Sequence, residues 1–159
     1  MRSVRTAALV LVICAMARPA RADITAFLGA NVTPSGRSAT GVAIGFGLLV
    51  VGFEFEYSST SEDLQAGAPS LKTGMGNVLL QTPTAISGLQ PYFTIGGGIY
   101  DESLNGQSDT SFGTNIGGGV KVSLAGPLRL RADYRVFSLG SGALYSPAHR
   151  FYVGLNLKF

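Results

Sequence analysis

Residues 128–136 have the sequence Leu-Arg-Leu-Arg-Ala-Asp-Tyr-Arg-Val, in which apolar or aromatic side chains alternate with charged ones. Successive side chains of a β-strand point to opposite faces, whereas a helix would scatter both kinds around its surface. The last nine residues, 151–159, alternate in the same way: Phe-Tyr-Val-Gly-Leu-Asn-Leu-Lys-Phe. Both stretches therefore predict strands with one apolar face and one polar face.

Six further stretches show this period of two. They lie at 24–32, 42–46, 51–57, 78–80, 93–99 and 116–124. The stretch 78–80 is the least regular, because its neighbours on the polar face would be Met75, Asn77, Leu79 and Gln81. All 22 glycines follow residue 22, and the longest apolar stretch there, 41–53, is too short for a membrane helix, which needs about 17–25 residues. The sequence predicts an all-β chain of eight antiparallel strands.

The polar faces of these strands carry seven charges. These are Glu54, Glu56, Lys121, Arg129, Arg131, Asp133 and Arg135. In a soluble sandwich or lipocalin-like barrel such charges face water, whereas in a membrane barrel the apolar face meets lipid and the charges line the lumen. The connections decide between the two, since they alternate between short ones (48–50, 83–89, 125–127) and mostly longer, polar ones (34–38, 58–73, 101–110, 140–147). This asymmetry predicts an eight-stranded, antiparallel, transmembrane up-and-down β-barrel.

The third and seventh strands lie opposite each other in a ring of eight. Strands about 4.8 Å apart and tilted by roughly 40° give a barrel about 16 Å wide, narrow enough for opposed side chains to meet. Glu54 and Glu56 follow one short turn by the same number of residues as Arg131 and Asp133 follow another. We therefore expect an ion-pair network in the lumen, with four cations against three carboxylates.

The first 22 residues have the features of a secretory signal peptide. Arg2 and Arg5 precede an apolar run at 7–17, and Ala20-Arg21-Ala22 is a small-x-small cleavage motif. We expect cleavage after Ala22, which leaves residues 23–159 as one transmembrane barrel domain; Ala15-Met16-Ala17 is an alternative motif.

Removal of that segment changes the charge of the chain. The precursor has a net charge of +3, but four of its arginines lie before residue 23, so the processed chain has eight basic and nine acidic groups. Charged residues make up only 13% of the sequence, and neither this content nor the charge favours a nucleic-acid partner. Cys14, the one cysteine, is also removed, so the domain has no disulfide.

The final strand resembles the C-terminal signal of outer-membrane barrels. Tyr152 and Gly154 are followed by Leu157 and Phe159 at the third-last and last positions. This resemblance implies recognition by the barrel-assembly machinery during biogenesis.

Three internal stretches extend the resemblance. They are Gln90-Pro91-Tyr92 followed by Gly96-Gly97-Gly98, then Asn115-Ile-Gly-Gly-Gly-Val120-Lys121, then Arg131-Ala-Asp133-Tyr134-Arg135. Over its processed length the chain is similar to the small eight-stranded barrels of the outer membrane protein A and opacity-protein type, which implies an integral protein of the bacterial outer membrane. We interpret the two triple-glycine segments, which one hairpin would place side by side, as lumen space for arginine side chains or as points of curvature.

Two stretches of the sequence suggest specific chemistry, one a calcium loop and the other a catalytic pair. Asp101, Ser103, Asn105, Gly106 and Asp109 imitate the start of an EF-hand calcium loop, but Phe112 occupies the position of the bidentate glutamate, so we expect a hairpin tip and no metal. His149 and Ser146 are the candidates for a lipid-modifying enzyme; residues three apart on a strand point to opposite faces, which argues against a hydrogen bond between them.

The sequence thus favours a non-catalytic barrel without a cofactor, with an ion-paired lumen that contributes to envelope integrity. The loops 58–73 and 101–110 would meet lipopolysaccharide or host surfaces through an acidic rim, and we expect a monomer. The alternative is a narrow channel, either weakly anion-selective or for hydrophobic solutes. The acidic rim consists of Glu62, Asp63, Asp101, Glu102 and Asp109, with Lys72 as its one cation.

Overall fold

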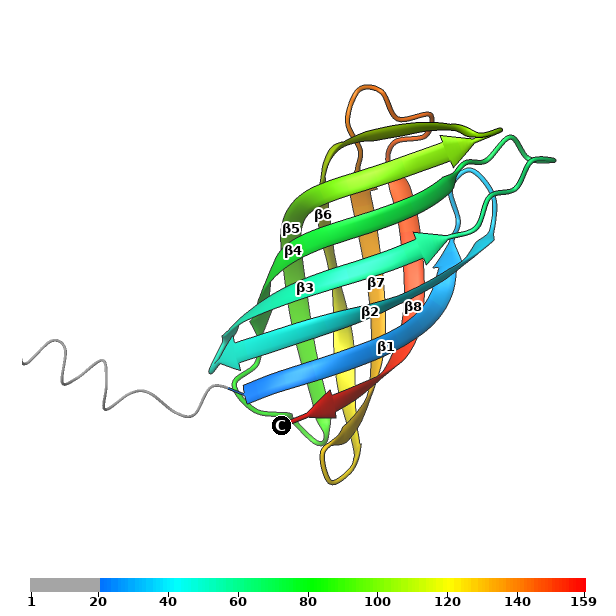
Figure 1. Ribbon diagram of the computed structural model, residues 1–159. Coiled ribbons are helices and arrows are strands. Elements are labelled where there is room, and N and C mark those ends of the chain that lie inside the picture. The colour runs from blue at the N-terminus through cyan, green and yellow to red at the C-terminus, as the bar shows by residue number, and fades with distance from the viewer. Residues whose placement is uncertain (1–20) are drawn as a thin grey trace, which may run out of the picture.

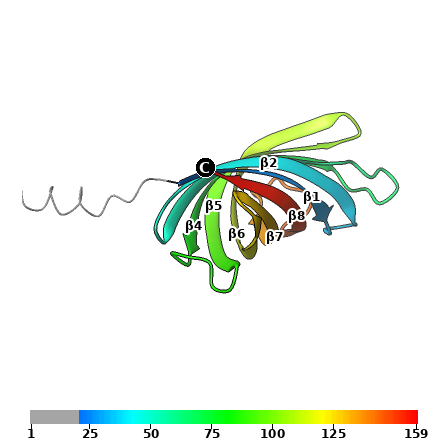
Figure 2. The same cartoon turned by 90° about the horizontal axis from the view of Figure 1, so that it is seen from below.

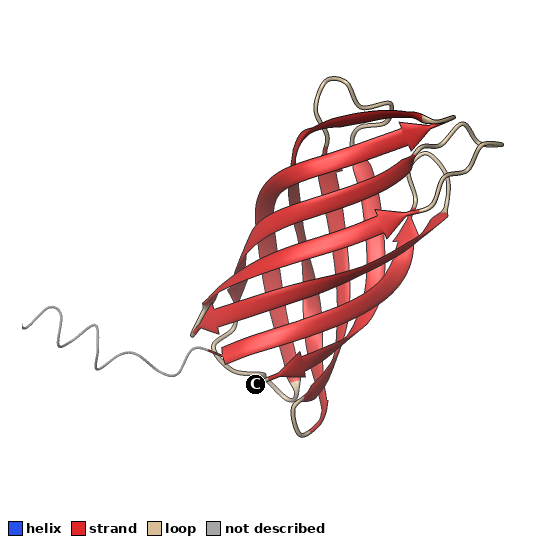
Figure 3. Ribbon diagram, viewed as in Figure 1, coloured by secondary structure: helices blue, strands red, loops and turns tan. Residues whose placement is uncertain are grey.

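The computed structural model describes residues 21–159, and these form one closed antiparallel barrel (Figures 1 and 3). The strands are β1 (Arg21–Asn31), β2 (Arg37–Leu48), β3 (Val51–Thr60), β4 (Ser70–Gln81), β5 (Leu89–Leu104), β6 (Gln107–Ala125), β7 (Leu128–Ser138) and β8 (Ala148–Lys158). The described residues contain no helix long and apolar enough to cross a membrane. The predicted eight-stranded up-and-down fold is confirmed.

Each strand pairs with the next one along the chain, and β8 pairs with β1 to close the ring. In this last pair Ile24 lies opposite Leu157 and Asn31 lies opposite Arg150. Closure leaves no strand edge with unpaired backbone groups, which is the condition for a sheet to exist inside a bilayer. The C-terminus and the start of β1 lie at the same end of the barrel, as Figure 1 shows.

The barrel has its apolar side chains outside and its charged side chains inside. Leu28 and Phe55 on the outer surface are 70% and 67% exposed, whereas Arg131 and Arg135 in the lumen are fully buried. Such a surface would be unfavourable in water, because the transfer of one apolar side chain out of water is favourable by about 1.5–3 kcal/mol of free energy. In the hydrocarbon of a bilayer the same apolar surface is favourable. The arrangement therefore confirms the prediction that the apolar faces of the strands meet lipid.

The short and long connections lie at opposite ends, as expected, but one expected loop is wrong. Residues 101–110 continue β5 and β6 in register, from Asp101 opposite Thr110 to Leu104 opposite Gln107. Only Asn105 and Gly106 turn the chain, both with positive φ, which is the conformation that an Asn-Gly hairpin turn requires. The hairpin projects beyond the rest of the barrel (Figure 2).

The uncertain fourth strand is a regular member of the barrel. It begins at Ser70 rather than after residue 73, and Met75, Asn77 and Leu79 are all buried on its lumenal face. The mixture of polar and apolar side chains has a physical reason, since the strand crosses lumen layers of different chemistry.

The two triple-glycine segments lie on neighbouring strands but do not face each other. Residues 96–98 pair with 113–115, and residues 117–119 pair with 92–94. A Cβ atom at Gly98 would fall within 3 Å of the Gly74 carbonyl, and one at Gly117 within 3 Å of the Tyr134 carbonyl. These glycines therefore allow neighbouring backbones to approach closely where the narrow barrel curves.

The predicted signal peptide lies almost entirely outside the described residues. Strand β1 already begins at Arg21, and the amide of Phe159 donates to the carbonyl of Ala22 at 2.8 Å. Cleavage after Ala22 would thus remove the first two residues of β1.

Candidate functional site

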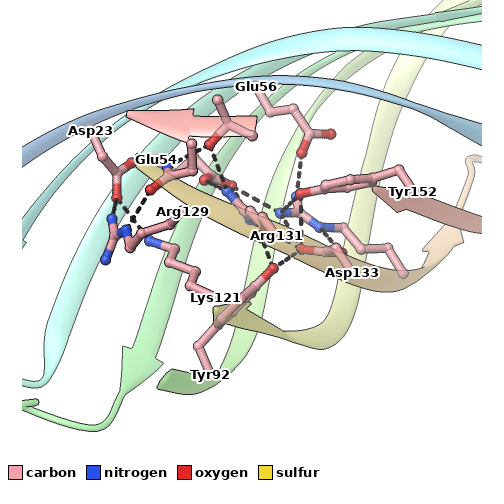
Figure 4. A network of polar contacts seen from close by, with 12 residues as sticks. Asp23, Glu54, Glu56, Tyr92, Lys121, Arg129, Arg131, Asp133 and Tyr152 are labelled. Atoms are coloured by element: carbon pink, nitrogen blue, oxygen red, sulfur yellow. Dashed lines mark hydrogen bonds and ion pairs between the residues drawn. The ribbon is translucent and has the colours of Figure 1, made fainter. Parts of the chain in front are cut away.

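The middle of the lumen holds a layer of buried ion pairs between β3 and β7 (Figure 4). The Arg131 guanidinium binds both carboxylate oxygens of Glu54, and its Nη2 lies 3.0 Å from Asp133. Arg135 contacts three carboxylates: Glu54 at 2.8 Å, Glu56 at 3.0 Å and Asp133 at 3.0 Å. Each of these side chains is at most 5% exposed. We call this group, together with Arg150, the central layer.

Two tyrosines add hydrogen bonds to the central layer. The hydroxyl of Tyr92 accepts from Arg131 Nε at 2.7 Å and donates to Asp133, and the Tyr152 hydroxyl donates to the same carboxylate at 2.9 Å. The Arg131 guanidinium also lies 4.9 Å from the centre of the Tyr92 ring. These hydrogen bonds offset part of the cost of burying the Asp133 carboxylate.

Arg150 extends the layer toward the extracellular side. Its guanidinium donates to Glu56 and to the hydroxyl of Ser58, and it lies 4.5 Å from the centre of the Phe137 ring. Above it the lumen becomes apolar. The side chains that fill this upper layer are Leu71, Met75, Tyr100, Phe137, Leu139 and Ala148.

The periplasmic end of the lumen has a separate, smaller cluster. Lys121 Nζ and Arg129 Nη2 both bind Oδ2 of Asp23, at 2.8 and 2.9 Å. Arg129 also donates to Asn156 at 2.7 Å and to Gln90 at 3.0 Å. We call the space around this cluster the vestibule.

All seven charged residues expected in the lumen face it, and the structure divides them into two groups. Glu54, Glu56, Arg131, Asp133 and Arg135 meet in the central layer, whereas Lys121 and Arg129 contact none of these carboxylates and bind Asp23. Sequence reasoning missed Asp23 and Arg150. Asp23 lies two residues before the lumenal Thr25, and Arg150 lies two residues before the lumenal Tyr152. Extending the alternating pattern of each strand by two residues would have found both.

The residues of the resembled C-terminal signal also have structural contacts in the folded barrel. Tyr152 stacks on Phe27 with ring centres 4.1 Å apart, and Gly154 lies opposite Phe27. Leu157 and Phe159 point outward toward lipid, and Phe159 is 64% exposed.

At the extracellular end most carboxylates of the predicted acidic rim bind parts of the chain itself. Glu62 accepts the amide of Asn105 at 2.9 Å, and Glu102, which is buried, accepts the amide of Leu144 at 2.9 Å. Asp63 accepts the amides two and three residues further on, and Asp101 accepts the Thr110 hydroxyl at 2.8 Å. The EF-hand alternative fails in geometry, since residues 101–109 form a flat hairpin whose side chains point to both faces.

The two candidate catalytic residues do not meet. The Ser146 hydroxyl lies against the backbone of Leu139, while His149 Nδ1 lies 2.7 Å from the Tyr134 hydroxyl on the outer surface.

The sequence of residues 6–159 matches the family model described as the outer membrane protein beta-barrel domain. The chain belongs to this family. It is therefore an integral protein of the outer membrane. Short turns are typical of the periplasmic side of such barrels, so we call the end with the short turns the periplasmic end. None of the curated proteins compared with the chain matches it.

Solved structures of other outer-membrane proteins share the fold at low sequence identity. The N-terminal β-barrel domain of Pseudomonas aeruginosa OprF has 18% identity and a TM-score of 0.68, over 87% of this chain and 97% of that one. Neisserial surface protein A has 14% identity and a TM-score of 0.62, over 87% and 94%. The outer membrane enzyme PagL has 14% identity and a TM-score of 0.53, over 86% and 98%. Such likeness shows the fold and leaves the activity to the residues of this chain.

Proposed function

We propose that this protein is a non-catalytic outer-membrane barrel whose sealed, ion-paired lumen makes it a rigid support for a preformed extracellular surface. The observation that carries the proposal is the contact of Arg135 with three carboxylates from β3 and β7, which ties opposite walls of the barrel together. A lumen crossed in this way resists deformation of the ring, and the protein would contribute to envelope integrity.

The layers of the lumen support a closed barrel rather than a channel. Arg131 and Arg135 are fully buried, and the apolar layer above them contains Met75, Tyr100 and Phe137, each at most 2% exposed. A conducting path would have to break several buried ion pairs, at about 3–5 kcal/mol for each partner removed.

The extracellular connections support the second half of the proposal. Glu62 ties residues 61–69 to the β5–β6 hairpin, and Glu102 ties that hairpin to residues 139–147. Arg37 at the start of β2 donates to the carbonyls of Thr33 and Pro69, which joins the connection between β1 and β2 to residues 61–69. The surface offered to lipopolysaccharide or to another cell is therefore largely preformed, and binding to it would cost little ordering entropy.

The absence of catalysis is part of the proposal, and the side chains near His149 support it. The His149 imidazole is hydrogen-bonded to the Tyr134 phenol, and the Ser146 hydroxyl is hydrogen-bonded to the Leu139 amide. His149 is therefore not placed to act as a base on Ser146. Incubation of the purified protein with lipopolysaccharide should leave its acyl chains intact. Deacylation that disappears in His149→Ala would contradict the proposal.

Planar-bilayer recording tests the closed lumen against the channel alternative. The periplasmic vestibule, a cavity of about 80 Å³ that reaches Glu54, is the feature that favours a channel. We expect no steady conductance from the wild-type protein. A steady conductance that is lost when Glu54 and Arg131 are neutralised together would favour the channel instead.

Biogenesis and oligomeric state provide three further parts of the proposal. We expect export with removal of residues 1–22, so N-terminal sequencing of the protein from outer membranes should begin at Asp23; a start at Arg18 would favour the alternative motif.

We also propose that the barrel-assembly machinery recognises β8 through Leu157 and Phe159, and that the product is a monomer. Phe159→Ala should lower the amount of assembled barrel in cells while leaving detergent refolding of the purified chain unchanged.

A further inference from the structure

The vestibule differs from the rest of the lumen because its charges do not balance. Its cavity of about 80 Å³ opens toward the periplasm and ends at Glu54. Once residues 1–22 are removed, three cations line it against two carboxylates: Lys121, Arg129 and Lys158 against Asp23 and Glu54. Glu54 is already bound by Arg131 and Arg135, so only Asp23 of these two carboxylates is available to the three cations.

Two of these cations share one oxygen atom. Lys121 and Arg129 both contact Oδ2 of Asp23, and the Lys121 side chain is 4% exposed. The Arg129 guanidinium has further partners in Asn156 and Gln90, whereas the three-proton ammonium of Lys121 has a single hydrogen bond to any of residues 21–159. A buried cation with donors to spare, beside a second cation, favours an anionic partner.

The opposite wall of the vestibule provides the space for such a partner. Gly45 and Gly47 on β2 and Gly52 on β3 line the cavity, and all three have lumenal parity. β2 and β3 face β6 and β7 across the ring, so glycines lie on the side away from Lys121 and Arg129. The volume is several times the 10–15 Å³ that one water molecule requires.

From this geometry we infer that the vestibule is a binding site for a small oxyanion that enters from the periplasm. Lys121 and Lys158 supply charge and donors, and Gln81 and Gln90 line the same cavity with amide groups. An ion with several oxygen atoms accepts hydrogen bonds from donors on different walls, which a spherical halide does less well. The site ends at the central layer, so it holds an anion without conducting it, and it is independent of the extracellular surface proposed above.

Calorimetric titration with inorganic phosphate tests the inference. The protein is purified in a non-ionic detergent from outer membranes, and ionic strength is held constant with chloride. We expect saturable binding with a dissociation constant of about 1 mM. Lys121→Met should weaken it at least tenfold by removing a charge, and Gly52→Val should do the same by filling the cavity. A Cβ at Gly52 would meet its nearest atom, in Leu79, at 3.5 Å, an ordinary contact, so this variant should fold.

Two matched controls distinguish the vestibule from general charge effects. Lys72→Met removes an outward-facing lysine near the extracellular end, and Gly74→Val adds the same side chain on the outer face of β4. Both should bind phosphate as the wild type does. No saturable binding up to 50 mM phosphate, equal loss in Lys72→Met, or chloride binding as tight as phosphate binding would each overturn the inference.

Discussion

The central layer and the vestibule are two polar regions of one lumen, and they differ in charge balance. In the central layer three arginines, Arg131, Arg135 and Arg150, face three carboxylates, Glu54, Glu56 and Asp133. In the vestibule two cations share Asp23. The surplus of one positive charge expected from the sequence persists when Asp23 and Arg150 are added, but it lies at the periplasmic end. Charge is balanced where water is excluded and unbalanced where water can enter.

The largest effect should come from removing a cation of the central layer. Arg135→Met leaves three buried carboxylates with two arginines, so we expect a loss of about 3–5 kcal/mol in the free energy of unfolding. Urea unfolding of the barrel in lipid vesicles measures this, and heat-modifiable gel mobility provides an independent readout.

Arg135→Lys is the matched control for that prediction. It keeps the charge but loses the planar fork that reaches Glu54, Glu56 and Asp133 together, so its loss should be smaller than that of Arg135→Met. A change below about 1 kcal/mol in Arg135→Met would show that water or lipid headgroups compensate the layer and would contradict its role in rigidity.

A double substitution sharpens the charge argument. Glu54→Gln combined with Arg135→Met removes one charge of each sign, so the pair should lose less stability than the sum of the single losses. We expect a coupling of about 1–3 kcal/mol in the double-mutant cycle. Additive losses would mean that packing around Tyr152, rather than charge balance, dominates the layer.

The same kind of change in the vestibule should have a much smaller effect on stability. Lys121→Met removes the surplus cation and leaves Asp23 paired with Arg129, so we expect the free energy of unfolding to change by less than about 1 kcal/mol. Urea unfolding under the conditions used for Arg135→Met gives the direct comparison. A loss as large as that of Arg135→Met would show that the two regions do not differ.

A similarly small effect on global stability is expected at the extracellular rim, where carboxylates bind backbone amides. Glu102→Ala frees the amide of Leu144 and should change the free energy of unfolding by about 1 kcal/mol. It should nevertheless increase proteinase K cleavage within residues 139–147 on whole cells. Lys72→Ala, an exposed rim position, is the control, and unchanged cleavage in Glu102→Ala would argue against a preformed surface.

Period-two alternation, together with the alternation of short and long connections, was enough to predict the fold and which face of each strand lines the lumen. It worked because lipid and lumen impose opposite demands on successive residues of a strand. It also placed Glu54 and Arg131 at similar depth on opposite walls, since both are counted from short turns whose position in the barrel is fixed.

The parts that sequence reasoning missed depend on contacts between distant residues. Whether 101–110 is a loop or a continued ladder depends on the pairing of Asp101 with Thr110, which polar composition does not reveal. The division of the charges into two regions depends on Asp23, ninety-eight residues away from Lys121, at the margin of the predicted signal peptide. Acidic residues of the rim look free in a sequence, yet Glu62 and Glu102 bond to amides more than forty residues away.

The seam between β1 and β8 joins the two segments that are farthest apart along the chain. Seven of the eight ladders join sequence neighbours and are the kind of contact that forms early, whereas this one has the highest contact order in the molecule. Any precursor that lacks β8 therefore has two open sheet edges, and the ring closes in one last step. Closure of the whole barrel thus depends on the eleven residues of β8, Ala148–Lys158.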